Sequence, residues 1–279
     1  MKKLNKLGTV LCAALFGSLA VAEEAAVPSK HNLKYALDAG YRLDGKKILG
    51  DHNLDYSYKV NDDYTLKAQV DFTTNREKDA AGEWNEKLGH KYFRMSIFGP
   101  TFAEVMGFKA QWAVRYMLPT DTDAQLAGTY GTIVPRIYFT REFSPSFNLT
   151  VVPGIAVQLN RSHKQFNDPA RADNVVGSTW LEVVPQFVLM KDLTLTADVT
   201  LDVEYTGYSE TKMAYLLDAD YELLYNIESL GNLGLGLFVA NTFNFGNHQA
   251  AVAGDKKGGG FFRSPQTTVG LRVQKSFGL

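Results

Sequence analysis

The sequence has one cysteine and no apolar run long enough to be a permanent membrane helix. Cys12 lies within residues 1–22, a segment that we expect to be removed on export. The remaining chain then contains no cysteine, which excludes disulfides, thiolate metal ligands and a cysteine nucleophile. No segment after residue 22 reaches the length of about 18 apolar residues that a transmembrane helix requires.

The first 22 residues have the pattern of a secretory signal. Lys2, Lys3 and Lys6 form a basic start, and a short apolar core follows over residues 8–19. The core ends at Ala20-Val21-Ala22, which supplies the small residues that precede a cleavage site. The pattern predicts a cleaved signal peptide over 1–22 and a single mature domain over 23–279.

The charge balance argues against a nucleic-acid partner. The chain has 29 basic and 30 acidic residues. Removing residues 1–22 removes three lysines and no acid, which leaves 26 basic and 30 acidic residues. Proteins that bind nucleic acid carry the opposite balance. The sequence also shows no adenylate, flavin or haem signature, so we expect no cofactor and no metal.

Apolar and polar residues alternate with a period of two along most of the chain. In LTLTADVTLDVEY (193–205) the odd positions are apolar and the even positions are Thr, Asp or Glu. This is the period of a β-strand with two different faces. Twelve segments of this kind are expected: 32–42, 52–60, 63–73, 91–98, 105–117, 129–142, 147–160, 178–189, 192–205, 213–226, 232–245 and 266–277.

Prolines interrupt three of the expected strands. Pro135, Pro153 and Pro185 lie inside their segments, where each would cost a hydrogen bond of the sheet. All three fall on the apolar parity. We therefore expect a β-bulge at each of them.

The connections between the expected strands alternate between short and long. The short ones are Asn61-Asp62, Gly99-Pro100-Thr101, residues 143–146, the neighbourhood of Lys191 and residues 228–231. The long ones are 43–51, 74–90, 118–128, 161–177, 206–212 and 246–265. Outer-membrane barrels have short periplasmic turns and long extracellular loops, whereas a soluble β-sandwich has no need of such asymmetry. The sequence thus predicts an all-β fold, a transmembrane antiparallel barrel of about 12 strands.

The last segment resembles the closing strand of Gram-negative outer-membrane β-barrel proteins. It alternates from Thr267 to Phe277 and places an aromatic residue near the C-terminus, although Gly278 and Leu279 follow it. The resemblance implies a bacterial outer-membrane location and recognition of the final strand by the barrel-assembly machinery. It also implies contact with outer-membrane lipids and lipopolysaccharide. Small polar solutes are the partners expected of a porin-like member.

If the apolar parity faces lipid, the other parity lines the interior with charge. The expected basic lining residues are Lys34, Arg42, Lys59, Lys67, Arg94, Lys109, Arg115, Arg136 and Arg272. The expected acidic lining residues are Glu182, Asp198, Asp202, Glu204, Asp218, Asp220 and Glu222. In a ring of twelve strands these two sets face each other, with Asp38, Asp55 and Asp71 interspersed on the basic side.

Opposed walls of this kind allow two interpretations. They create a transverse field across a water-filled constriction, which favours polar or zwitterionic solutes. Alternatively, the same residues pair into salt bridges that fill a narrow lumen. Small residues of the inward parity (Gly154, Ala156, Gly234, Gly236 and Ala240) favour the open pore. We therefore expect a channel for passive diffusion of small hydrophilic solutes.

Two other functional classes remain as alternatives. One is a non-conducting structural or adhesion barrel whose loops bind a surface partner. The other is an outer-membrane lipid hydrolase, for which His52, His90, His163 and His248 are expected near the loop end and Ser162 adjoins His163. Neighbours on a strand point to opposite faces, so this pair does not make a dyad. We predict no catalytic residues and no enzyme.

Overall fold

The protein is a closed antiparallel β-barrel of twelve strands in the computed structural model, which describes residues 30–43, 47–78, 82–120, 128–161, 174–206, 212–244 and 267–278. Each strand pairs with its neighbours in the sequence, and β1 closes the ring against β12. This arrangement confirms the predicted fold class. The predicted signal peptide lies outside the described residues.

Several strands, most of all β2 and β4, are longer than the sequence pattern indicates. The first six are β1 (His31–Arg42), β2 (Lys47–Lys59), β3 (Thr65–Lys78), β4 (Trp84–Val105), β5 (Phe108–Pro119) and β6 (Thr129–Ser144). The second six are β7 (Phe147–Asn160), β8 (Val175–Met190), β9 (Leu193–Thr206), β10 (Lys212–Ile227), β11 (Leu233–Asn244) and β12 (Thr268–Gly278). A 3-10 turn, η1 (Glu228–Leu230), connects β10 to β11. Among the described residues no helix combines the length and the hydropathy of a membrane span.

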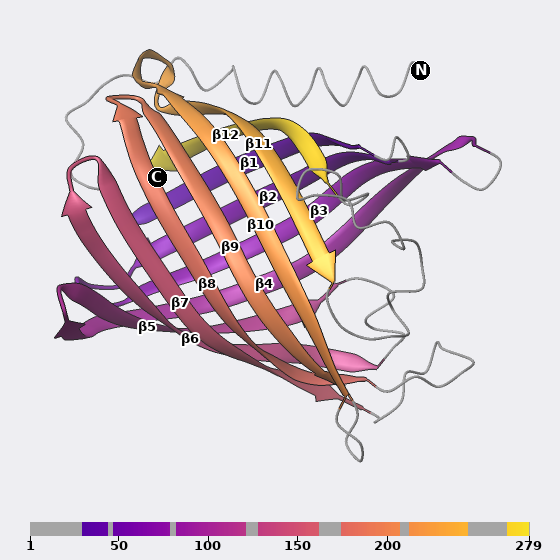
Figure 1. Ribbon diagram of the computed structural model, residues 1–279, viewed down its shortest axis with the longest axis horizontal. Coiled ribbons are helices and arrows are strands. Elements are labelled where there is room, and N and C mark those ends of the chain that lie inside the picture. The colour runs from indigo at the N-terminus through magenta and orange to yellow at the C-terminus, as the bar shows by residue number, and fades with distance from the viewer. Residues whose placement is uncertain are drawn as a thin grey trace.

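Short turns gather at one end of the barrel, which we call the turn end (Figure 1). The start of β1 and the end of β12 lie there too, and the opposite end is called the loop end. The predicted asymmetry holds for the connections 120–128, 161–174 and 245–267. It fails after β1, where β2 begins at Lys47 and leaves only residues 43–46 in place of the predicted 43–51. It also fails after β3, where β4 begins at Trp84 and leaves only residues 79–83 in place of the predicted 74–90.

The turn predicted at Gly99-Pro100-Thr101 is wrong. These residues lie inside β4, and the chain reverses instead at Met106 and Gly107, both of which have positive φ. Two register shifts between β4 and β5 accommodate Pro100. A side chain at position 99 would overlap the indole of Trp112, so this glycine serves close packing rather than reversal.

The bulges predicted at Pro135, Pro153 and Pro185 are also wrong. The ladder passes each proline in unbroken register, with the pairs Pro135–Val114, Pro153–Leu181 and Pro185–Leu149. Toward the other neighbouring strand, each proline has no paired residue. Pairing resumes on both sides of the proline in the same register, so no residue is inserted. A proline lacks only one N–H, so the strand loses a bond toward one neighbour and keeps the ladder with the other.

Contacts that cross an intervening strand show which side chains point inward. The guanidinium of Arg136 on β6 lies 5.2 Å from the ring centre of Trp180 on β8, and Gly154 of β7 lies between them in register. Arg272 on β12 likewise reaches Glu222 on β10 over Gly236 of β11. Side chains converge in this way only on the concave face of the sheet. The charged parity therefore faces the lumen.

The apolar parity forms the outer wall. Leu54, Leu66, Met95, Leu237 and Leu271 all have exposed side chains on strands whose polar neighbours point inward. Aromatic residues of this parity continue around the turn end, where the rings of Phe108, Phe143, Phe147 and Phe187 follow one another at centre distances of 4.8 to 6.0 Å. Apolar walls flanked by aromatic residues suit a bilayer and its interfaces.

The packing of Trp180 over Gly154 gives the first testable prediction. A side chain at position 154 would overlap the indole, so Gly154→Val forces Trp180 from its place and should lower the free energy of unfolding by about 1–3 kcal/mol. In a Trp180→Ala background the same change should cost far less, because the overlap is gone. Urea unfolding of the barrel in detergent micelles measures both costs. An equal cost in the two backgrounds would contradict this packing.

Candidate functional site: the charged lining of the barrel

The basic residues of the lumen lie mostly on β1 to β6, and aspartates on the same strands neutralise many of them. Lys67 pairs with Asp55 at 2.9 Å between Nζ and Oδ2, and Arg94 pairs with Asp71 at 2.6 Å between Nη2 and Oδ2. Asp71 also accepts hydrogen bonds from Asn53 and Gln69. The basic wall is therefore largely compensated. Lys59 differs, because it pairs with Asp62 in the exposed β2–β3 turn.

Arg272 is the centre of the strongest charge network. It bonds Asp38 through two parallel contacts, Nε to Oδ1 at 2.6 Å and Nη2 to Oδ2 at 2.7 Å. Its Nη1 donates to Oε2 of Glu222 at 2.6 Å, and the guanidinium lies 5.8 Å from the ring centre of Phe238. Because Asp38 is on β1 and Glu222 on β10, one side chain ties three strands together across the seam where the barrel closes.

The acidic wall on β9 and β10 is different, because most of its carboxylates have no cation partner. Asp198, Asp202, Glu204, Asp218 and Asp220 form no ion pair with any cation of the described chain. Asp198 and Asp220 are directly opposite each other in the ladder, an arrangement of like charges that is destabilising. Within the described chain, Glu182 and Glu222 are the members of the predicted acidic set that lie within ion-pair distance of a cation, Arg136 and Arg272.

Aromatic and charged side chains meet between the two walls. The Nη1 of Arg136 lies 4.0 Å from Oε2 of Glu182 and donates to the hydroxyl of Tyr138 at 3.3 Å. Trp180 packs against Gly154 beneath this group. Gly154 therefore makes room for a bulky neighbour and leaves no opening at its own position. Gly234 and Gly236 have the same role, because Leu224, Gln274, Glu222 and Arg272 occupy the space beside them.

A polar cavity of about 340 Å³ opens at the turn end of the barrel. Lys34, Asn226, Gln274 and Ser276 line it from the strands, and the β8–β9 and β10–β11 turns complete it. Lys191 and Glu228 join those two turns through an ion pair of 3.0 Å, and this hydrogen bond raises the pKa of Lys191. The lumen thus has a hydrophilic mouth at this end.

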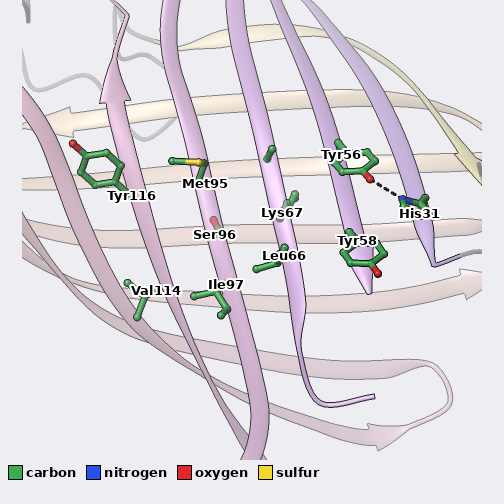
Figure 2. A pocket seen from close by; sticks show the side chains of 11 residues that line it. His31, Tyr56, Tyr58, Leu66, Lys67, Met95, Ser96, Ile97, Val114 and Tyr116 are labelled. Atoms are coloured by element: carbon green, nitrogen blue, oxygen red, sulfur yellow. Dashed lines mark hydrogen bonds between the residues drawn. The ribbon is translucent and has the colours of Figure 1, made fainter. Parts of the chain in front are cut away.

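A larger groove, of about 600 Å³, lies on the outer wall of β1 to β5. Figure 2 shows Tyr56, Tyr58, Leu66, Met95, Ile97, Val114 and Tyr116 around it, with Nδ1 of His31 hydrogen-bonded to the Tyr56 hydroxyl at its edge. Its lining side chains belong mainly to the apolar parity. The groove is therefore a feature of the outer wall, separate from the charged lining.

The histidines considered for catalysis do not form a site in the described chain. His52 lies on β2, is largely buried, and bonds the hydroxyls of Tyr35 and Thr74 through its two ring nitrogens at 2.7 and 3.0 Å. It stacks on Phe72 at 4.4 Å on the outer wall. Ser162, His163 and His248 lie outside the described residues. No group of three or more potential metal ligands occurs among the described residues.

The sequence analysis missed two aromatic residues of the lumen, Trp180 and Tyr138. Both occupy positions of the polar parity, and this parity is the signal that could have placed them in the lumen. The partners of Arg272 are separated from it by 234 and 50 residues, so only the closed ring brings them together.

Comparisons with solved structures agree with this architecture. The chain is similar to the NanC porin, with a TM-score of 0.55 and 10% identity over 88% of this chain and 100% of that one. It is equally similar to an outer-membrane channel from Pseudomonas putida F1, with a TM-score of 0.55 and 9% identity over 92% of this chain and 98% of that one. The sequence matches no family model, and it matches no curated protein. The chain therefore has the fold of porin-like outer-membrane barrels.

The Arg272 network yields the second prediction. Arg272→Gln leaves Asp38 and Glu222 half-buried without a cation, so the free energy of unfolding should fall by about 3 kcal/mol. A triple variant that also carries Asp38→Asn and Glu222→Gln should recover much of this loss, because no unpaired charge remains. Urea titration in micelles provides the values. A triple variant as unstable as the single one would show that packing, and not charge, is what Arg272 contributes.

Proposed function

We propose that the protein is an outer-membrane channel for the passive diffusion of small hydrophilic solutes, exported by the signal peptide over residues 1–22. The observation that carries the proposal is the row of carboxylates on β9 and β10 that form no ion pair with a cation of the described residues. These residues are Asp198, Asp202, Glu204, Asp218 and Asp220.

A carboxylate without a cation partner requires water to stay ionised. Moving an ionised carboxylate from water into a dry interior costs several kcal/mol, and two such groups opposite each other cost more. The side chain of Asp218 is exposed although it points into the lumen. A lumen packed solid with side chains would leave these charges both buried and unbalanced. A hydrated path along β9 and β10 removes this cost.

The two walls then act unequally on a solute. On β1 to β4 the aspartates pair with Lys67, Arg94 and Arg272, which reduces the positive field. The acidic wall keeps most of its charge. Among the basic lining residues, Lys34, Lys109 and Arg115 have no carboxylate within ion-pair distance in the described chain. The field across the lumen therefore runs between a few cations and a continuous acidic surface, which favours polar solutes that carry separated charges.

Currents through planar bilayers provide the third prediction. The wild-type protein should give stable stepwise currents. Replacing Asp198, Asp218 and Asp220 together with Asn should lower the permeability of K⁺ relative to Cl⁻ by about threefold, which corresponds to roughly half a kT of local potential acting with opposite sign on the two ions. The reversal potential in a KCl gradient measures this ratio.

A control replaces Asp63 with Asn, because this residue lies in the exposed β2–β3 turn and forms no ion pair in the described chain. This change should leave the reversal potential unchanged. A folded, heat-modifiable barrel that never conducts would refute the channel. A reversal potential that is the same in the triple variant and the wild type would show that the acidic wall is not on the conduction path.

A further inference from the structure

Three arginines converge on the inner face of three consecutive strands. Arg115 of β5 is opposite Ser96 of β4 and Val134 of β6 in the two ladders. Arg94 is two residues from Ser96, and Arg136 is two residues from Val134, so each is a diagonal neighbour of Arg115. Diagonal neighbours lie roughly 7–8 Å apart, within reach of long side chains. The three guanidinium groups thus share one region of the lumen.

Only two carboxylates of the described chain lie within ion-pair distance of these three cations. Asp71 pairs with Arg94, and its second oxygen is already bonded by Asn53 and Gln69. Glu182 approaches Arg136 only at 4.0 Å. The Nε atoms of Arg94 and Arg136 are buried and donate to no described acceptor. Neither flanking arginine is therefore fully hydrogen-bonded by the described chain.

Arg115 is the uncompensated member of the cluster. Its one hydrogen bond is from Nε to the hydroxyl of Ser96 at 3.3 Å, and no carboxylate lies within ion-pair distance of it in the described chain. The cations on either side repel it. The inward side chains beside it are small or apolar, since Ala113 is opposite Arg136, and Ser96 and Val134 are opposite Arg115. The other N–H groups of the Arg115 guanidinium are thus free to donate hydrogen bonds to a bound solute.

We propose that Arg94, Arg115 and Arg136 form a binding subsite for the oxyanion group of a solute, a carboxylate or a phosphate, inside the lumen. Guanidinium forks match the paired oxygens of these groups and bind them through parallel charge-assisted hydrogen bonds. An oxyanion beside Arg115 would accept hydrogen bonds from its remaining donors and offset the repulsion among the three cations. The inference rests on the proposed channel and adds the chemical class that it recognises on the wall opposite the carboxylates.

The subsite is tested by binding and by current block. Inorganic phosphate and acetate are titrated into the folded barrel in dodecyl maltoside micelles, with binding followed by ³¹P and ¹³C NMR, and into bilayers at constant chloride. Both oxyanions should bind and reduce the current. Arg115→Gln should weaken each effect by about tenfold or more, the loss expected for a charge-assisted hydrogen bond.

Two further variants separate geometry from charge. Arg115→Lys keeps the positive charge without the fork, so chloride permeability should persist while the preference for oxyanions over chloride falls. Arg141→Gln is the matched control. Arg141 lies on the outer wall, where it bonds the Met106 carbonyl and stacks on Phe143, so oxyanion binding should be unchanged.

The possible results distinguish the subsite from the channel. Oxyanion binding that is unchanged in Arg115→Gln, or no stronger than that of chloride, would overturn the subsite even if the barrel conducts. Phosphate binding that is lost in Arg115→Gln would support the subsite even if no current is seen, and the absent current would then refute the channel alone. A gel shift on heating verifies that each variant is folded before it is measured.

Discussion

Closure of the backbone ladder is the constraint on which the rest of this structure depends. In lipid, no water can satisfy an unpaired N–H or C=O group, so every strand needs a partner on both sides. β1 and β12 meet this need by pairing from Asn32–Gly278 to Arg42–Thr268. Arg272 reinforces the seam because it bonds Asp38 across it and Glu222 two strands away. Once the ring is closed, successive side chains point alternately outward and inward.

The concave face brings together side chains that a flat sheet would keep apart. Two side-chain pairs span an intervening strand, Arg136 with Trp180 and Arg272 with Glu222. In each case a glycine of the middle strand, Gly154 or Gly236, leaves the space beneath. The small inward residues that suggested an open bore are thus the places where large neighbours pack. Beside the acidic strands, the inward side chain of Asp218 remains exposed.

The sequence predicts the strands well because their period is a local property. Alternation from Leu193 to Tyr205 marks β9 almost to the residue, and the count of twelve strands is confirmed. Prolines and turns mislead because their meaning depends on a neighbouring strand. Pro135 loses pairing on one side only, and Gly99 accommodates Trp112 instead of reversing the chain. Parity assigns charged residues to the lumen, but which of them form ion pairs depends on the register of distant strands.

Pairing, more than the number of charges, distinguishes the two walls. Counted from the sequence, the lining has nine basic and seven acidic residues, which suggests two walls of similar strength. Asp38, Asp55 and Asp71 cancel much of the basic set, and most of the acidic set has no counterpart. The charge of Arg115 therefore contributes more to the field in the lumen than that of Lys67 or Arg272, because a neighbouring carboxylate neutralises each of those two. In the proposed channel, a solute would meet isolated cations on one side and the carboxylates of β9 and β10 on the other, so the residues left unpaired are those that would act on it.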